Sequence, residues 1–122
     1  MIDHIVLSVK DYKQSKAFYE KALAPLGYRL LMEFDDNGAG FGTGKRAHFW
    51  IMQREPASTS VHVAFDSADR ETVQKFHTAA LEVGGRDNGA PGLRSHYHAN
   101  YYSAFVFDPD GNNIEAVCHK SE

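Results

Sequence analysis

Histidine is the chemically informative residue type in this chain of 122 residues, which has seven histidines and a single cysteine. His4 and His62 each lie in a short β-rich segment, and Glu115 lies in a third such segment near the C-terminus. Because side chains alternate along a strand, each of these three groups shares its face with small or polar neighbours. Two imidazoles and a carboxylate form a metal site that suits Fe(II), Zn, Ni, Co or Mn and leaves positions open for a substrate.

The two histidines occupy equivalent positions of an internal repeat. An offset of 58 residues relates His4 to His62, and it also relates a possible helix cap, Asp11, to Asp69. The same offset joins further apolar and glycine pairs: Phe18 with Phe76, Leu23 with Leu81, and Gly27 with Gly85. This coincidence indicates two copies of a βαβββ module of about 55 residues. We therefore predict one domain, residues 1–122, made of module one (about 1–54) and module two (about 60–119).

Each copy is expected to contain one helix and a set of strands. The expected strands are residues 2–9, 28–34 and 47–53 in module one, and 61–65, 101–107 and 113–118 in module two; the glycine-rich residues 38–44 are expected to form a further strand or a loop. A helix is expected after each cap, and residues 86–100, with two glycines and a proline, are expected to be irregular. An α+β fold follows, with both helices outside a curved mixed sheet and a concave face inside. On that face His4, His62 and Glu115 would converge on a metal cleft.

Composition argues against several function classes. Thirteen basic residues against sixteen acidic ones give a net charge of −3, and the basic residues do not cluster, so a nucleic-acid-binding surface is unsupported. The lone Cys118 cannot form an internal disulfide. No apolar window approaches the roughly 18–20 residues of a membrane span, and no signal peptide is evident. We expect a cytoplasmic protein with a small-molecule substrate as its partner.

The chain resembles the vicinal oxygen chelate superfamily, also called the glyoxalase/bleomycin-resistance/dioxygenase superfamily. The stretches that carry the resemblance are Ile2-Asp3-His4-Ile5, Ser15-Lys16-Ala17-Phe18-Tyr19, Val61-His62-Val63-Ala64-Phe65 and Phe107-Asp108-Pro109-Asp110-Gly111-Asn112-Asn113-Ile114-Glu115. The resemblance implies paired βαβββ modules and a divalent metal that binds a substrate through neighbouring oxygens. It implies His4, His62 and Glu115 as ligands and Glu115 as the proton-transferring base. A homodimer is expected, with the cleft built either within one chain or across a swapped dimer.

Glyoxalase-I-like members of the superfamily usually take a fourth ligand, commonly a glutamate, from the fourth strand of the first module. This chain has no carboxylate in that strand. One alignment of the two copies sets His48 opposite Glu115, and another sets Trp50 there. His48 is therefore our candidate fourth ligand, with a water or a three-ligand site as the alternatives. Trp50 is a candidate substrate contact, and the missing glutamate argues against a lactoylglutathione lyase in the strict sense.

A second group of chemically active side chains lies in the segment before the penultimate strand, where two histidines, three tyrosines and an arginine occur within ten residues. This density suits a substrate wall or lid, although a loop that merely covers the end of the sheet would have the same composition. The candidate roles are general acid–base catalysis for His96 and His98, anion binding for Arg94, and hydrogen-bond donation for Tyr101 and Tyr102.

Together these features favour a metal-dependent, glyoxalase-like enzyme that transfers a proton in a lyase or isomerase reaction. The two-histidine, one-carboxylate set also suits an extradiol-type dioxygenase. A third interpretation is a non-catalytic protein of the bleomycin-resistance type, which would sequester a drug or metabolite with its aromatic loop.

Overall fold

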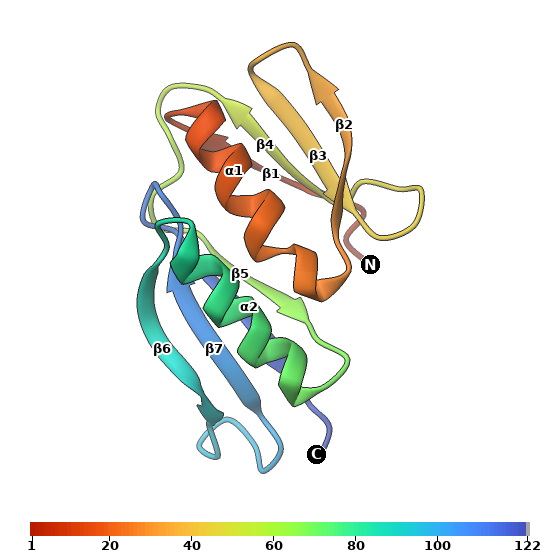
Figure 1. The fold of residues 1–122 in the computed structure, drawn as a ribbon, viewed down its shortest axis with the longest axis vertical. Helices are drawn as coiled ribbons and strands as arrows, with labels where there is room; N and C mark the ends of the chain where they lie inside the picture. Colours follow the sequence, from red (N-terminus) through yellow and green to blue (C-terminus); the bar gives the residue numbers. More distant parts are fainter. Residues whose placement is uncertain (122) are drawn as a thin grey trace.

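The computed structural model describes residues 1–121 and shows two βαβββ modules (Figure 1). Module one contains β1 (Ile5–Val9), α1 (Tyr12–Ala22), the 3-10 helix η1 (Ala24–Leu26), β2 (Arg29–Phe34), β3 (Gly38–Gly42) and β4 (Phe49–Gln53). Module two contains β5 (His62–Asp66), α2 (Arg70–Glu82), β6 (Arg86–Leu93), β7 (Tyr102–Phe107) and β8 (Asn113–Cys118). The α+β fold with two paired modules is therefore confirmed.

Each module forms its own mixed sheet, and the strand order is the same in both. The order is β1-β4-β3-β2 in module one and β5-β8-β7-β6 in module two. The first and last strands of each module pair in parallel, and the other pairs are antiparallel. Instead of one continuous curved sheet, residues 1–121 form two four-stranded sheets, and neither closes into a barrel. Each sheet thus has one face covered by helix and one open face.

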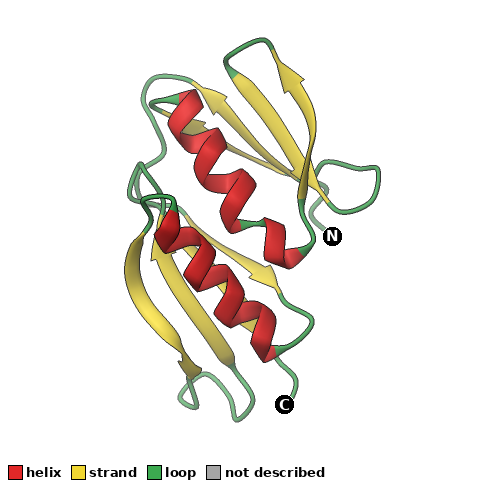
Figure 2. Cartoon of the chain, viewed as in Figure 1, coloured by secondary structure: helices red, strands yellow, loops and turns green. Residues whose placement is uncertain are grey.

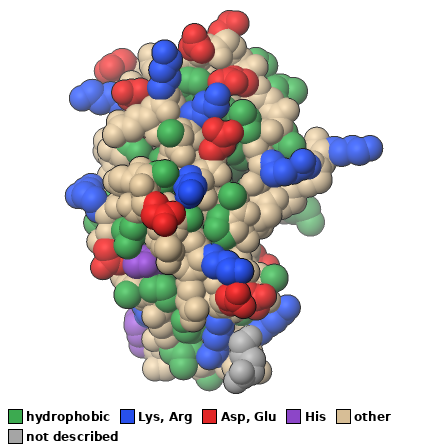
Figure 3. Space-filling model, in the orientation of Figure 1, with side chains coloured by type: hydrophobic (Ala, Val, Ile, Leu, Met, Phe, Trp, Pro, Cys, Tyr) green, Lys and Arg blue, Asp and Glu red, His purple; other side chains and the backbone are tan. Residues whose placement is uncertain are grey.

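The helices lie side by side and cover the same side of the molecule (Figure 2). Each begins at the predicted cap, because the carboxylate of Asp11 accepts from the amide of Gln14 at 3.2 Å and that of Asp69 accepts from the amide of Thr72 at 2.8 Å. On this side acidic and basic side chains are interspersed (Figure 3). None of the helices within residues 1–121 is long and apolar enough to cross a membrane.

The prediction of an irregular segment from residue 86 to residue 100 is wrong in its first half, where β6 pairs with β7. Gly89, Pro91 and Gly92 would normally argue against a strand, but β6 is the last strand of its sheet. An edge strand tolerates a proline that cannot donate, and glycines accommodate the two register shifts in this ladder. The loop that remains between β6 and β7 is correspondingly short.

An aromatic core joins the two modules beneath the helices. Phe49 of module one contacts Tyr19 at a centroid distance of 4.9 Å and Phe65 of module two at 5.3 Å. The hydroxyl of buried Tyr19 also donates to the buried carboxylate of Asp108, at 2.5 Å. Because Phe49 and Phe65 lie on the core-facing sides of β4 and β5, the alternate residues of these strands are directed to the open faces, where the candidate site lies.

Candidate metal and substrate site

The centre of the site in module two is a buried carboxylate. Glu115 lies on β8, opposite Ala64 of β5 and Phe105 of β7, and is 1% exposed. Its Oε1 lies 2.7 Å from Nε2 of His62, and its Oε2 accepts from the hydroxyl of Tyr101. A carboxylate removed from water needs such partners, and here both oxygens have one. The donor atoms of His62 and Glu115 therefore converge as the sequence predicts.

Tyr101 is held by three aromatic side chains. Tyr97, His98 and His119 each pack against its ring, with centroid distances of 4.8, 5.3 and 5.3 Å. Burial of the hydroxyl and its hydrogen bond to Glu115 both raise the pKa of Tyr101, so the phenol stays protonated and donates. The loop before β7 thus fixes the donor that orients Glu115.

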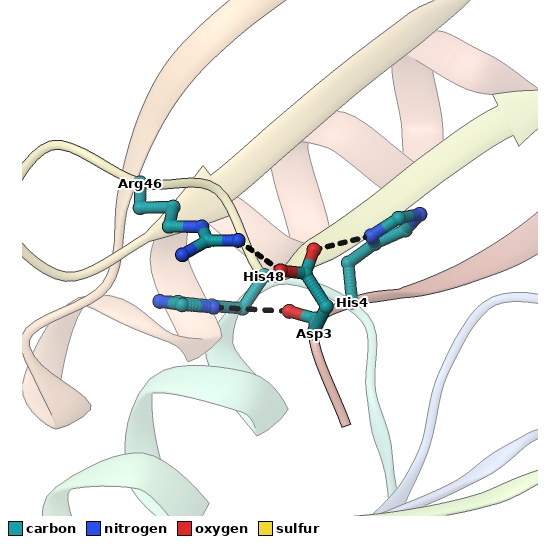
Figure 4. A network of polar contacts seen from close by, with 4 residues as sticks. All are labelled: Asp3, His4, Arg46 and His48. Carbon is teal, nitrogen blue, oxygen red and sulfur yellow. Dashed lines mark hydrogen bonds and ion pairs between the residues drawn. The ribbon is translucent and has the colours of Figure 1, made fainter. Parts of the chain in front are cut away.

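His4 lies in module one within a separate polar network (Figure 4). Its Nδ1 lies 2.7 Å from the carboxylate of Asp3, which also binds the guanidinium of Arg46. The hydrogen bond from His4 and the charge of Arg46 lower the pKa of Asp3. A carboxylate on Nδ1 fixes the ring and leaves Nε2 as the free donor, which is the usual arrangement around a metal-binding histidine.

Strand register identifies the residue that corresponds to Glu115 in module one. Val6 pairs with Trp50 across β1 and β4, just as Ala64 pairs with Glu115 across β5 and β8. Trp50 is therefore the structural equivalent of Glu115. His48 precedes β4, and its Nδ1 donates to the main-chain carbonyl of Asp3 at 3.2 Å. The structure thus agrees with the alignment that places Trp50, and not His48, opposite Glu115.

An apolar surface covers the open face of module one. It is formed by Val6, Phe34, Trp50 and Met52, which we call the apolar platform, and with His4 and Arg54 it lines a groove of about 340 Å³. Phe34 and Trp50 stack with centroids 5.7 Å apart and planes 11° apart.

Two glycines of β3 make the apolar platform flat. A Cβ atom on Gly40 would lie 2.7 Å from the ring of Trp50, and one on Gly38 would lie 2.5 Å from the sulfur of Met52. The glycine-rich third strand is thereby explained, because only glycine lets these two side chains lie down across it.

The remaining candidates of the loop before β7 divide between the two faces of the sheet. The guanidinium of Arg94 lies over Phe105, at 5.5 Å from the ring centroid, on the same face as Glu115. Tyr102 lies on the helix-covered face, where Gln74 donates to its hydroxyl and Arg70 lies over its ring, so the structure does not bring it to the site. His96 packs on Tyr97 with centroids 4.2 Å apart.

The single chain brings together only part of the predicted ligand set. His62 and Glu115 meet in module two, whereas His4 lies on the open face of module one. Among residues 1–121 no group of three His, Cys, Asp or Glu side chains is close enough to hold a metal ion. The nitrogen and oxygen donors fit a divalent metal in type, and each module offers one part of the set.

Sequence reasoning missed several residues that support the site. They are Asp3, Phe34, Met52, Phe105 and His119. Phe34 lies on β2 and reaches Trp50 across β3, and Asp3 and His119 lie just beyond strand ends, so strand alternation alone does not reveal them. Alternation along β4 puts Met52 on the same face as Trp50 but gives it no role, and the register between β7 and β8 would have revealed Phe105.

Comparison with known proteins agrees with this architecture. The family model of the Glyoxalase/Bleomycin resistance protein/Dioxygenase superfamily matches residues 1–116. A glyoxalase/bleomycin resistance protein from Albidiferax ferrireducens has a similar structure, with a TM-score of 0.84 and 27% identity over 97% of this chain and 98% of that one. No curated protein matches the chain at a significant level.

Two more distant structures share the fold. One is a glyoxalase/bleomycin resistance protein/dioxygenase family enzyme from Burkholderia phytofirmans, with a TM-score of 0.75 and 20% identity over 98% of each chain. The other is a lactoylglutathione lyase from Agrobacterium tumefaciens, with a TM-score of 0.69 and 17% identity over 97% of this chain and 92% of that one. The family match, which spans nearly the whole sequence, shows that the chain belongs to the Glyoxalase/Bleomycin resistance protein/Dioxygenase superfamily.

Proposed function

We propose that the protein is a metal-dependent, glyoxalase-like enzyme that transfers a proton on a small, oxygen-chelating substrate in a lyase or isomerase reaction. The observation that carries the proposal is the buried carboxylate of Glu115, engaged by His62 on one oxygen and by Tyr101 on the other. A buried, hydrogen-bonded carboxylate is better suited to act as a metal ligand and a base than a carboxylate on the solvated surface is.

The residues that would hold the metal are His4, His62 and Glu115. Because His4 lies in the other module of the same chain, we propose that His4 of a second copy completes the set in a homodimer. Two observations support this arrangement: the open face of each module carries one part of the ligand set, and the apolar platform beside His4 is uncovered in the single chain. His48 is the alternative ligand of module one: the Asp3 carbonyl holds its Nδ1 and leaves Nε2 free, but Trp50, and not His48, occupies the position equivalent to Glu115.

When bound, the metal would stabilise negative charge on the substrate oxygens. Glu115 takes a proton from the substrate carbon next to these oxygens and returns it to a neighbouring atom of the substrate. Tyr101 holds Oε2 and thereby limits the directions in which the carboxylate can turn. The apolar platform holds the hydrocarbon part of the substrate and excludes water from it. His96 and His98, which contact Tyr97 and Tyr101, have an indirect role in this scheme.

The first experiment measures divalent metal bound by the purified protein and by E115Q. We expect E115Q to lower metal affinity by at least about 100-fold, since even changes around metal ligands cost about 10–100-fold. The matched control is E71Q, a change of the same chemistry at an exposed position on α2. Metal affinity in E115Q equal to that of E71Q would refute the proposed site.

Mixing two inactive variants tests the homodimer. H4A and E115Q are purified separately, then unfolded and refolded together. If each site takes His4 from one copy and Glu115 from the other, the mixed dimer contains one intact site and metal binding returns to part of the population. If the ligands come from a single chain, neither subunit of a mixed dimer has a complete set, and mixing restores nothing.

An extradiol-type dioxygenase is the second candidate function, and the position of Trp50 favours it. With no carboxylate there, the protein ligands are two histidines and one glutamate, the set that non-haem Fe(II) oxygenases use. Oxygen uptake by the Fe(II)-loaded protein in the presence of catechol would favour the dioxygenase over the lyase. Stoichiometric binding of an aromatic ligand that chelators do not affect would instead favour a binding protein that uses the apolar platform.

A further inference from the structure

Arg94 is half-buried and packs both on an aromatic ring and on the backbone of β6. Its side chain lies over Phe105, and its Nη2 donates to the carbonyl of Ala90 at 2.7 Å. Two glycines of β6 leave room for it, since a Cβ atom on Gly89 or on Gly92 would lie 3.1 Å from a guanidinium nitrogen. Gly89 also has a φ of 152°, a backbone conformation that residues with a side chain rarely adopt. The backbone of β6 is thus shaped around the guanidinium.

The charge of Arg94 is not neutralised by a direct partner. No carboxylate among residues 1–121 forms an ion pair with it, and its Nη1 and Nε have no hydrogen-bond partner there. Arg94 is near enough to Asp87 to lower the pKa of Asp87. The carboxylate of Asp87, however, is hydrogen-bonded to His77 and to the amide of Gly89. Glu115, on the same face, is taken by His62 and Tyr101.

Arg94 also faces the proposed site. Phe105, which it covers, pairs with Glu115 across β7 and β8 and lies 6.0 Å from the ring of His62. A planar guanidinium with two free donor directions binds planar oxyanions, carboxylates above all, through paired hydrogen bonds. A ligand that reaches from Glu115 across Phe105 therefore meets a fixed cation.

We propose that the substrate is a small organic anion whose carboxylate is bound by Arg94 while the rest of the molecule extends toward His62 and Glu115. Arg94 then determines specificity by selecting the acid over its neutral analogue. This inference rests on the proposed function for the direction in which the ligand extends, but anion binding by Arg94 needs no metal and no turnover.

The test uses benzoate and the isosteric neutral molecule benzamide, titrated into metal-free protein. Binding is followed by the NMR signal of the Arg94 Nε–H group, assigned from its disappearance in R94K. We expect benzoate to shift this signal saturably and benzamide not to shift it. For R94Q, which lacks this group, benzoate binding is measured from the backbone amide shifts of β6 and β7. We expect R94Q to bind benzoate about tenfold or more weakly, because a charge-assisted hydrogen bond contributes about 1.5–3 kcal/mol.

R86Q is the matched control, because Arg86 lies on the same strand and also covers a phenylalanine, Phe107, at 5.1 Å. It should leave benzoate binding within about twofold of the parent protein. Equal responses to benzoate and benzamide, no response to benzoate at millimolar concentrations, or equal losses in R94Q and R86Q would each overturn the inference. None of these outcomes bears on metal binding by Glu115, which the E115Q comparison decides separately.

Discussion

In module one the open face carries Trp50 lying across Gly40, whereas the equivalent positions of module two hold Glu115 and Phe105. The strand order, the helix and the helix cap are nevertheless the same in both modules. The two modules thus share the residues that build the fold and differ in the residues on their open faces. One module supplies an apolar surface beside a histidine, and the other supplies a carboxylate, a second histidine and a cation.

The turns before the last strand of each module differ in the same way. Asp108 begins this turn in module two, and the register places Thr43 at the equivalent point of module one. Asp108 is 1% exposed and accepts from Tyr19, from the main-chain amides of Asp110 and Asn112, and from the Asn112 side chain. Thr43 is exposed. One turn therefore ties the two modules together, and the other has no such role.

Removing the Asp108 carboxylate, which ties the two modules together, should have the largest effect on stability. D108A leaves several buried donors without an acceptor, so we expect it to lower the free energy of unfolding by about 3 kcal/mol or more. The measurement is urea unfolding followed by circular dichroism, with T43A as the control at the equivalent position. A loss in D108A no larger than that in T43A would mean that the two turns are energetically alike.

The next prediction concerns the glycine beneath Trp50. G40A places a methyl group against the indole ring, which should lower the free energy of unfolding by about 1–3 kcal/mol and change the fluorescence of this single tryptophan. Removing the ring should remove the conflict, so the same substitution made in W50A is expected to have little cost. If G40A is equally destabilising with and without Trp50, the glycine serves some other purpose.

Restoring the missing carboxylate would make the two modules more alike. W50E puts an acid at the position equivalent to Glu115, beside His4, and should tighten divalent metal binding by about tenfold. W50F keeps an aromatic ring in the apolar platform and should leave metal affinity unchanged. Calorimetric titration of the metal into each variant measures both. Metal affinity in W50E no higher than in W50F would show that a carboxylate at position 50 does not reach the metal.

The smallest effect is expected at the two helix caps. Hydrogen bonds from Thr72 lower the pKa of Asp69 below its ordinary value of 3.8, so its cap stabilises the protein above that pH and is lost as the pH falls through the lowered pKa. The thermal midpoint of D69N should therefore lie below that of the parent at about pH 6, with the gap closing toward about pH 2. D11N, whose contact is longer at 3.2 Å, should show a smaller gap. A gap that widens in acid would contradict this sign.

Local sequence signals predicted the elements well where the structure depends on neighbours in sequence. The carboxylates of Asp11 and Asp69 cap their helices by accepting from the amides three residues later. The repeat correctly relates His4 to His62, although β1 begins at Ile5 and His4 lies just before it, whereas His62 is the first residue of β5. The strand β6 was missed because its pairing with β7 overrides the glycine and proline signals in its sequence. That pairing depends on the partner strand β7, and the residues of β6 taken alone do not encode it.

The candidate site was predicted in composition but not in placement. Spacing identified His62 and Glu115, and the structure joins them at 2.7 Å. The choice between His48 and Trp50 stayed open because it depends on the register of β1 with β4, which sequence offsets leave ambiguous. The separation of His4 from Glu115 depends on how the two sheets lie relative to each other, and strand alternation carries no information about that.

The contact between Tyr19 and Asp108 spans 89 residues of chain. During synthesis the phenol of Tyr19 leaves the ribosome long before its acceptor, Asp108, has been made. The last turn and strand must emerge before that hydroxyl is satisfied and the aromatic core between the helices and sheets can close. Burying Tyr19 with its hydroxyl satisfied therefore requires nearly all of the chain, so closure of the aromatic core depends on a non-local contact although each module repeats a locally simple pattern.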